Sequence, residues 1–291
     1  MDSDTYRRVG DLSVSVDLTI PPAGASAVVV WIHGGALING DRDSVPGWLS
    51  DACVESELAL ASIDYRLAPE TKLPDIVGDV EDAFRWLRTV AGQRFPVASD
   101  RIAAVGESAG GYLALTAGFR VQPRLDAVVS LYGYGDLIGA WYSRPSAHPC
   151  HQGVDLTPDE IALLMSGPSV AEGGLRDGDG HAFYRHCRRH GTWPTTVTGW
   201  DPDREAERFR PFMPVANVSD RYPPTILVHG SDDTDVPYER SAEMAAELAR
   251  HGVEHALLEI PGAEHGFAGA DPAAVAAARD EVIAFLRRHL D

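Results

Sequence analysis

The sequence predicts an α/β protein with a doubly wound, mostly parallel β-sheet and one large insertion. From about residue 5 to 135, and again after about residue 220, apolar runs rich in β-branched residues alternate with stretches of helical periodicity. This alternation is typical of a parallel sheet covered by helices on both faces. Between these parts, residues 136–220 lose the rhythm and carry three tryptophans, several prolines and five histidines. We therefore expect a core of residues 1–135 and 221–291, interrupted by residues 136–220.

The elements expected before the insertion follow from periodicity. Short apolar runs between polar turns predict buried strands, and apolar residues at helical spacing predict amphipathic helices. The predicted strands cover residues 27–32, 58–63, 101–105 and 125–132, and the predicted helices cover residues 76–90 and 108–119.

The pattern of predicted elements within the insertion differs from the pattern that follows it. The insertion shows only short helical stretches such as residues 158–166, and its many aromatic residues distinguish it from a solvated linker. After it, strands are predicted over residues 225–229 and 254–260, and helices over residues 238–251 and 272–289.

Composition restricts the partners that this protein can have. Hydrophobic residues make up 44% of its 291 residues and charged residues 23%, which is ordinary for a globular protein. Asp and Glu number 43 against 25 Lys and Arg, and the formal net charge of -18 disfavours nucleic acid and anionic membranes as partners. Three cysteines are too few for a disulfide framework, and no apolar run approaches the length of a membrane span. We expect a cytoplasmic protein, and the net charge neither requires nor forbids a homo-oligomer.

The segment Gly106-Glu107-Ser108-Ala109-Gly110 stands where a predicted strand ends and a helix begins. Glycines on both sides of a serine permit the sharp turn that lifts its hydroxyl clear of the chain. Ser108 is therefore a candidate nucleophile, which would need a histidine to take its proton and a carboxylate to orient that histidine. Taken alone, the turn also fits a serine that caps a helix.

Two later loops that follow predicted strands contain the required groups. One holds the carboxylates Asp232, Asp233 and Asp235, and the other presents His265 among small residues. Open α/β sheets place their functional groups at such strand ends. The residues themselves leave the choice among the three carboxylates open, and a carboxylate in that loop could equally cap the helix that follows.

A small-residue loop, His33-Gly34-Gly35-Ala36, follows the first predicted strand. Acyl chemistry develops negative charge on the carbonyl oxygen, and backbone N–H groups of small residues can approach that oxygen closely. We expect Gly34, Gly35 and Ala36, together with Ala109, to form an oxyanion hole.

With these motifs in this order, the chain resembles the α/β-hydrolase superfamily, and within it the hormone-sensitive-lipase-like carboxylesterases. The shared motifs are HGG followed by a small residue, DYRLAPE, GxSAG and a late Asp and His, and they lie within residues 25–135 and 220–290. The resemblance implies a catalytic triad of Ser108, Asp233 and His265, no cofactor, and a helical cap formed by the insertion. Family members often have a third glycine at the position of Ala36, where the N–H group is retained.

The resemblance implies hydrolysis of carboxylic esters with small or medium acyl groups, through an acyl-enzyme. The partner would be a small-molecule ester or amide. One alternative keeps the triad and cleaves amides, as in an amidase, arylformamidase or peptidase. A second is a biosynthetic acyl transferase or cyclase whose pocket excludes water, and a third is a non-enzymatic binding module on the same fold.

Two further expectations concern side chains around the site. The aromatic residues of the insertion either line an acyl or alcohol pocket or form a small core, and the candidate substrate-binding residues are Leu37, Trp141, Tyr142 and Trp193. In DYRLAPE, Arg66 is expected to pair with Glu107 and brace Ser108.

The insertion also contains side chains that could bind zinc. They are His148, Cys150, His151, His181, His186, Cys187 and His190. No CxxC or HExxH pattern is present, and Arg185, Arg188 and Arg189 would repel a cation. We therefore expect no metal.

Overall fold

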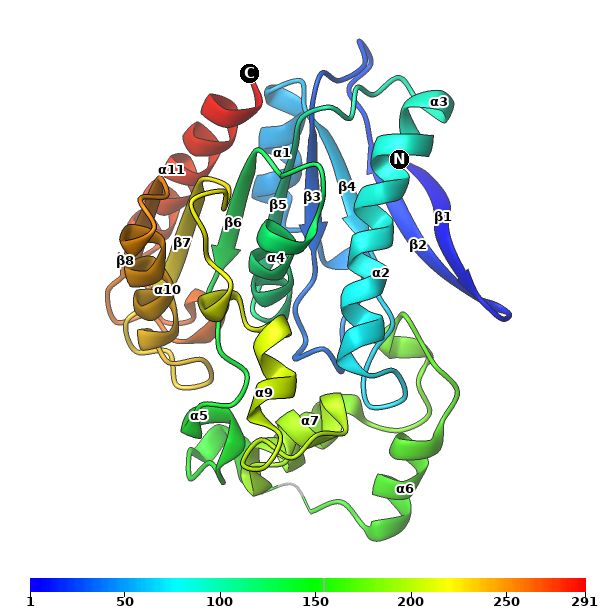
Figure 1. Ribbon diagram of the computed structural model, residues 1–291, viewed down its shortest axis with the longest axis vertical. Coiled ribbons are helices and arrows are strands. Elements are labelled where there is room, and N and C mark those ends of the chain that lie inside the picture. The colour runs from blue at the N-terminus through cyan, green and yellow to red at the C-terminus, as the bar shows by residue number, and fades with distance from the viewer. Residues whose placement is uncertain (154) are drawn as a thin grey trace.

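The computed structural model describes residues 1–153 and 155–291, and in these residues eight strands form one sheet in the order β1-β2-β4-β3-β5-β6-β7-β8 (Figure 1). The strands are β1 (Asp2–Val9), β2 (Leu12–Thr19), β3 (Val28–Ile32), β4 (Ala59–Ile63), β5 (Ile102–Glu107), β6 (Ala127–Leu131), β7 (Thr225–Gly230) and β8 (His255–Ile260). The two pairings of β2, with β1 and with β4, are antiparallel, and the pairings from β4 through β8 are parallel. The predicted doubly wound, mostly parallel sheet is confirmed.

The antiparallel hairpin β1–β2 was not predicted from the sequence. Strand β1 carries mostly polar residues, and only Tyr6 of it is buried. A polar edge strand lacks the apolar run that marks a central strand, because only one of its edges and one of its faces meet the rest of the protein. Pairing of β2 with β4 over residues 16–19 and 60–63 places this hairpin at the sheet edge.

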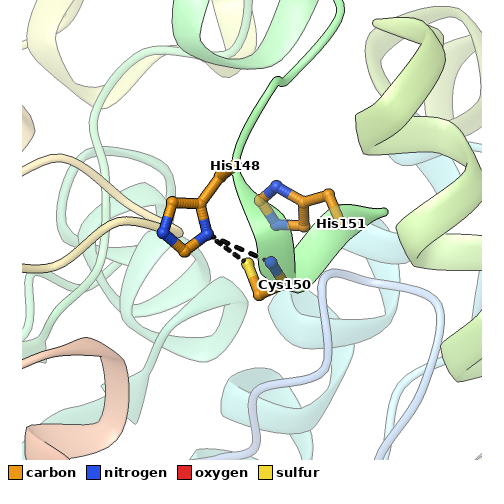
Figure 2. A group of neighbouring side chains, drawn as sticks. All are labelled: His148, Cys150 and His151. Carbon is orange, nitrogen blue, oxygen red and sulfur yellow. Dashed lines mark hydrogen bonds between the residues drawn. The ribbon is translucent and has the colours of Figure 1, made fainter. Parts of the chain in front are cut away.

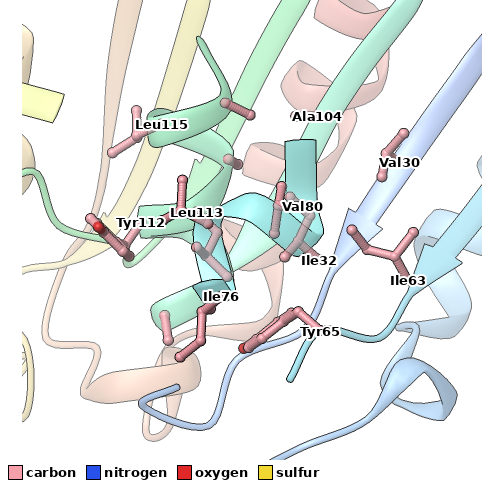
Figure 3. Packing of buried hydrophobic residues seen from close by; sticks show 14 of the residues in the cluster. Val30, Ile32, Ile63, Tyr65, Ile76, Val80, Ala104, Tyr112, Leu113 and Leu115 are labelled. Atoms are coloured by element: carbon pink, nitrogen blue, oxygen red, sulfur yellow. The ribbon is translucent and has the colours of Figure 1, made fainter. Parts of the chain in front are cut away.

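Helices cover both faces of the sheet because side chains alternate along each strand. In β3, Val28, Val30 and Ile32 join a core cluster with the helices α2 and α4, part of which Figure 3 shows. Val29 and Trp31 point to the other face and pack in a cluster with α1 and α11. The helices outside the insertion are α1 (Gly47–Glu55), α2 (Leu73–Trp86), α3 (Gly92–Arg94), α4 (Ala109–Arg120), α10 (Glu239–Arg250) and α11 (Pro272–Leu290). Short 3-10 or π turns there are η1 (Arg42–Ser44), η2 (Leu87–Ala91) and η7 (His265–Phe267).

Residues 136–220, which we call the cap segment, join β6 to β7, and those of them that the structure describes lie at one end of the sheet (Figure 1). Their helices are α5 (Ala140–Ser143), α6 (Pro158–Ser166), α7 (Gly180–His190), α8 (Trp193–Thr198) and α9 (Ala206–Phe209), with the turns η3 (Pro149–His151), η4 (Gly173–Leu175), η5 (Arg210–Phe212) and η6 (Pro214–Ala216). Buried cap residues such as Tyr142, Phe183 and Trp193 belong to the same cluster as α2 and α4. The cap segment is therefore packed continuously onto the core. The assignment of residues 136–220 as a separate unit stays a prediction.

Polar contacts also join the cap segment to the core. Arg176 forms a buried ion pair with Glu70 of the DYRLAPE motif, with 2.7 Å between Nη2 and Oε2. Lys72 Nζ donates to the carbonyl of Thr196 at 2.7 Å. These contacts connect the middle of the cap segment to the loop that precedes α2. No helix in the described parts of the chain is both long enough and apolar enough to cross a bilayer.

Candidate active site

Ser108 occupies the sharp turn between β5 and α4. Its backbone has φ 51° and ψ -119°, a conformation that costs an L-residue energy and persists only where the surroundings enforce it. The two flanking glycines allow the turn: a Cβ on Gly106 would lie 2.2 Å from the carbonyl oxygen of Gly110, and one on Gly110 would lie 2.0 Å from that of Ile32. The GESAG segment thus holds the serine at the end of β5, as its pattern predicts.

The structure brings Ser108, His265 and Asp233 together in one chain of hydrogen bonds. Ser108 Oγ lies 3.0 Å from His265 Nε2, and His265 Nδ1 lies 2.7 Å from Asp233 Oδ2. A carboxylate only accepts, so Nδ1 carries the proton when the imidazole is neutral, and Nε2 is free to accept the serine proton. The residues come from the ends of β5, β7 and β8, which lie at the same edge of the sheet.

Asp233 is held in place by its own loop. Its Oδ1 accepts hydrogen bonds from the N–H groups of Asp235 at 3.0 Å and Val236 at 2.8 Å. Asp232 is exposed and takes no part in this arrangement. Among the three carboxylates that the sequence left open, Asp233 is therefore the one bonded to His265 Nδ1.

A buried histidine that the sequence analysis missed supports this carboxylate. His229 Nε2 lies 2.8 Å from the carbonyl of Val236 and 3.2 Å from Asp233 Oδ2. Both neighbours are acceptors, so Nε2 carries a proton and donates to them. Burial alone would raise the pKa of Asp233, but the hydrogen bonds from His229 and His265 and the N–H of Val236 lower it below its usual value.

The charges around His265 favour its protonated form. Burial by itself lowers the pKa of His265, but the hydrogen bond to Asp233 and the negative charges of Asp235, Asp233 and Glu107 together raise it above its usual value. Asp235 Oδ2 lies 3.9 Å from His265 Nε2, on the side of the ring that faces Ser108. The site therefore stabilises an imidazolium, the state that forms when the histidine takes a proton.

The predicted oxyanion loop has a strained backbone, and Tyr65 holds the residues at its start. Gly35 has φ 95°, and a Cβ there would lie 2.2 Å from the carbonyl oxygen of Asn39. Ala36 also has a positive φ, of 58°. Tyr65 of DYRLAPE stacks on His33 with ring centroids 4.2 Å apart, and its hydroxyl donates to the carbonyls of His33 at 3.0 Å and Gly34 at 3.2 Å.

These contacts direct the carbonyls of the loop into the protein. Trp193 Nε1 donates to the carbonyl of Ala36 at 2.9 Å, so the cap segment also holds this loop. Within residues 1–153 and 155–291, the N–H groups of Gly35, Ala36 and Ala109 have no protein acceptor. They remain available to an oxygen atom bound beside Ser108.

The expected pairing of Arg66 with Glu107 is wrong. Arg66 forms a buried ion pair with Asp79 of α2, with 2.7 Å between Nε and Oδ2. Glu107 instead accepts a hydrogen bond from Tyr132 Oη at 2.6 Å. A second carboxylate of α2 also lies near this arginine, with Asp75 Oδ1 3.6 Å from Arg66 Nη2. DYRLAPE thus supports the site through Tyr65 and through the packing of α2, and Tyr132 supports the residue before Ser108.

Ser108 and His265 open into a cavity of about 310 Å³. Its wall includes the loop Gly34–Gly35–Ala36 together with Asn39, His181, Tyr184 and Asp235. A second cavity of about 510 Å³ shares His181, Tyr184, Asp235 and His265 with the first. The two cavities therefore form one cleft between the core and the cap segment.

The four candidate substrate-binding residues do not line this cleft, which corrects that expectation. Leu37, Tyr142 and Trp193 are at most 1% exposed, and Trp141 is half-buried against the same cluster. Tyr142 stacks on Trp193 with ring centroids 3.8 Å apart and on Trp141 with centroids 4.1 Å apart. This aromatic stack fills the space between the cap segment and the core. The cap aromatic that does line the cleft is Tyr184.

The zinc-capable side chains of the cap segment separate into different places. His148, Cys150 and His151 lie together beside the cleft. His186 and His190 contact each other on α7, with ring centroids 4.4 Å apart. Cys187 is buried and donates to Thr196 Oγ1 at 3.6 Å.

Comparison with known proteins agrees with the fold and with the order of the motifs. The family model described as alpha/beta hydrolase fold matches residues 29–269. The protein therefore belongs to the α/β-hydrolase family, as the sequence motifs predict.

Two curated proteins and one solved structure illustrate what this chain is similar to. Esterase LipC of Mycobacterium tuberculosis is 28% identical over 262 residues, which cover 84% of this chain and 54% of LipC. An ethyl acetate hydrolase of Pseudomonas putida is 26% identical over 253 residues, covering 84% of this chain and 67% of that protein. The crystal structure of an alpha/beta hydrolase superfamily protein from Enterococcus faecalis superposes with a TM-score of 0.75 at 21% identity, over 99% of this chain and 98% of the other. The chain thus spans about half the length of LipC, and the solved structure shares its fold.

Proposed function

We propose that this protein is a serine hydrolase that cleaves carboxylic esters with small or medium acyl groups. The observation that carries the proposal is the hydrogen-bonded chain from Ser108 through His265 to Asp233, which opens into a cavity bordered by the loop Gly34–Gly35–Ala36. A serine, a base and an orienting carboxylate in this order are the requirements for acyl transfer to a hydroxyl.

In the first half-reaction Ser108 Oγ attacks the ester carbonyl while His265 Nε2 takes the hydroxyl proton. Asp233 keeps Nδ1 protonated and stabilises the imidazolium that results. The negative charge on the carbonyl oxygen is stabilised by the free N–H groups of Gly35, Ala36 and Ala109. Gly34 contributes by bringing the loop close, because a Cβ there would lie 3.3 Å from the Cβ of Ser108.

The imidazolium then protonates the leaving alcohol, and an acyl-enzyme remains on Ser108. In the second half-reaction His265 takes a proton from water, whose oxygen attacks the acyl group, and returns that proton to Ser108. The same donors stabilise the second oxyanion. No cofactor enters these steps.

The size and lining of the cavity beside Ser108 support small polar substrates. The cavity beside Ser108 is about 310 Å³ and is lined by glycines and by polar side chains such as Asn39, His181 and Tyr184. The methyl of Ala36 further narrows the room beside the oxyanion loop. The relatives named as an esterase and an ethyl acetate hydrolase support an ester rather than an amide or an acyl-transfer reaction. The cytoplasmic location and the lack of nucleic-acid or membrane partners stay predictions from composition, and composition leaves a homo-oligomer open.

A fluorophosphonate tests the proposal directly, because it phosphonylates an activated serine. The intact mass of the wild-type protein should increase by one adduct, which peptide mapping places on Ser108. Ser108→Ala should give no adduct and should hydrolyse p-nitrophenyl acetate at least about a thousandfold more slowly. Ser231→Ala serves as a control and should retain both the adduct and the hydrolysis of p-nitrophenyl acetate. Wild-type protein without an adduct, or ester turnover that survives in Ser108→Ala, would contradict the proposal.

A further inference from the structure

We propose that His148, Cys150 and His151 form a binding site for a divalent cation of the zinc class, in the wall of the cleft. One imidazole nitrogen from each histidine and the Cys150 sulfur all lie within 4.8 Å of one another. His148 Nδ1 is 2.8 Å from Cys150 Sγ, and Figure 2 shows the three side chains gathered around the turn η3. This proposal is independent of the ester hydrolysis proposed above.

The donor set selects the kind of ion. Two imidazoles and a thiolate suit Zn²⁺ or a similar transition metal, whereas Mg²⁺ and Ca²⁺ prefer oxygen ligands. In a tetrahedral zinc site, with bonds of about 2.0 Å to nitrogen and 2.3 Å to sulfur, neighbouring ligand atoms are about 3.5 Å apart. The three atoms already lie within 4.8 Å of one another, so small side-chain rotations bring them to these distances.

One histidine of the cluster, His151, is already oriented. His151 is 2% exposed, and its Nδ1 lies 2.8 Å from Ser146 Oγ while its Nε2 lies 2.9 Å from Asp235 Oδ1. If Nδ1 binds the ion, the carboxylate of Asp235 accepts the N–H of a ligating ring, an arrangement that strengthens zinc ligands. If Nε2 binds it, Asp235 is within reach as a fourth ligand.

The arginines that argued against a metal at the level of sequence have partners in the folded protein. Arg188 Nη1 is 2.6 Å from Asp235 Oδ1, and Arg189 Nη1 is 2.5 Å from Asp155 Oδ1. Their positive charge is thus largely balanced by carboxylates, and a thiolate at Cys150 would add a further negative charge beside the ion. Arg185 also lines this cavity.

The location of the cluster connects the ion to the cleft. His148, Cys150 and His151 line the cavity of about 510 Å³ that also contains Asp235 and His265. Three protein ligands leave a fourth coordination position, which water or a donor atom of a bound molecule fills when Asp235 does not.

Titration of the whole, reduced, chelator-treated chain with Co²⁺ tests the site, because Co²⁺ reports its ligands by absorption. We expect one Co²⁺ per chain, a thiolate-to-cobalt charge-transfer band, and loss of the cobalt spectrum when one equivalent of Zn²⁺ is added. Cys150→Ser should abolish the charge-transfer band, and His148→Ala should weaken Co²⁺ binding at least about tenfold. Cys150 is exposed, so its substitution leaves the fold intact, which circular dichroism verifies.

Two controls separate this cluster from the other candidate ligands. The double variant His186→Ala and His190→Ala removes the neighbouring histidine pair of α7, and Cys53→Ala removes a buried thiol of the core. Both should retain the band and the affinity. Wild-type protein without a thiolate band, or a band that persists in Cys150→Ser, would show that the proposal is wrong.

Discussion

The two walls of the cleft are built in different ways. On the core side, Ser108, His265 and Asp233 stand at the ends of parallel strands. The backbone turn holds Ser108, two N–H groups of its own loop hold Asp233, and the hydrogen bond to Asp233 holds His265. On the cap side, side chains from η3 and α7 converge on Asp235, which accepts from His151 at 2.9 Å and from Tyr184 at 2.7 Å. The core thus places its reactive side chains through short contiguous motifs. The cap places its cleft-lining side chains through contacts between segments that are distant in sequence.

The ion pairs show the same difference. In the core, the side chains of Arg66 and Asp79 are 7% and 0% exposed. Across the cleft, those of Arg188 and Asp235 are 3% and 20% exposed, so the carboxylate reaches water and any bound ligand. We therefore expect a substitution in the core to change the rate of the reaction or the stability of the fold. A substitution that faces the cap should mainly change the pH dependence of the reaction and its substrate preference.

The largest expected effect is at Asp233 on the core side. Asp233→Asn leaves the shape of the loop but turns an amide toward His265 Nδ1, so the histidine is held in the wrong tautomer, and kcat should fall by about 10⁴-fold. Asp232→Asn is the matched control, because Asp232 is the exposed neighbour in the same loop. Steady-state ester hydrolysis measures both, and equal losses in the two variants would refute the assignment of Asp233.

The next effect concerns the stability of the core. Arg66→Met removes the more buried of two arginines that pair with Asp79, while Arg7 Nη1 stays 3.0 Å from Asp79 Oδ1. The free energy of unfolding should therefore fall by about 3 kcal/mol, the lower end of the cost of breaking a buried pair. Arg85→Met removes an arginine that is 65% exposed and pairs with Asp82, and should cost less than about 1 kcal/mol. Urea unfolding compares the two variants. A small loss for Arg66→Met would show that the buried pair is not what distinguishes the core.

A smaller effect is expected at Asp235, where the cap and core sides meet. His265 accepts a proton only when neutral, so ester hydrolysis declines as the pH falls through its pKa, which the hydrogen bond to Asp233 and the nearby carboxylates raise above its usual value. Asp235→Asn removes a negative charge that raises this pKa, so the acid limb of kcat/KM should move to lower pH. The pH profile of Asp232→Asn should match the wild type. A shift of the Asp235→Asn profile to higher pH would contradict this account.

The smallest effect is expected in the oxyanion loop. Ala36→Gly relieves a positive φ at the cost of a more flexible unfolded chain, so stability should change by less than about 1 kcal/mol. Removal of the methyl widens the space beside Ser108, and esters with bulkier acyl groups should gain in kcat/KM relative to acetate. A series of p-nitrophenyl esters measures this preference. An unchanged preference would mean that Ala36 does not limit the substrate.

Some features could be predicted because the residues that cause them are adjacent in sequence. The glycines around Ser108 and in the loop Gly34–Gly35–Ala36 make turns that other residues cannot adopt, so a short motif indicates where the backbone must bend. Alternating apolar runs and helical periods likewise predicted the central strands and the helices that cover them. The polar edge strand β1 carries no such signal.

Only the tertiary structure decided which side chains pair with one another. Arg66 pairs with Asp79 rather than Glu107, His229 supports Asp233, and His151 reaches Asp235 across 84 positions of sequence. The cap aromatics became core rather than pocket because packing against α2 and α4 excludes water from them. The sequence by itself determined the fold and the reactive motifs, since these depend on local backbone geometry and periodicity. Ion pairs, supporting hydrogen bonds and the lining of the cleft depend on which distant side chains packing brings within a few ångströms of each other.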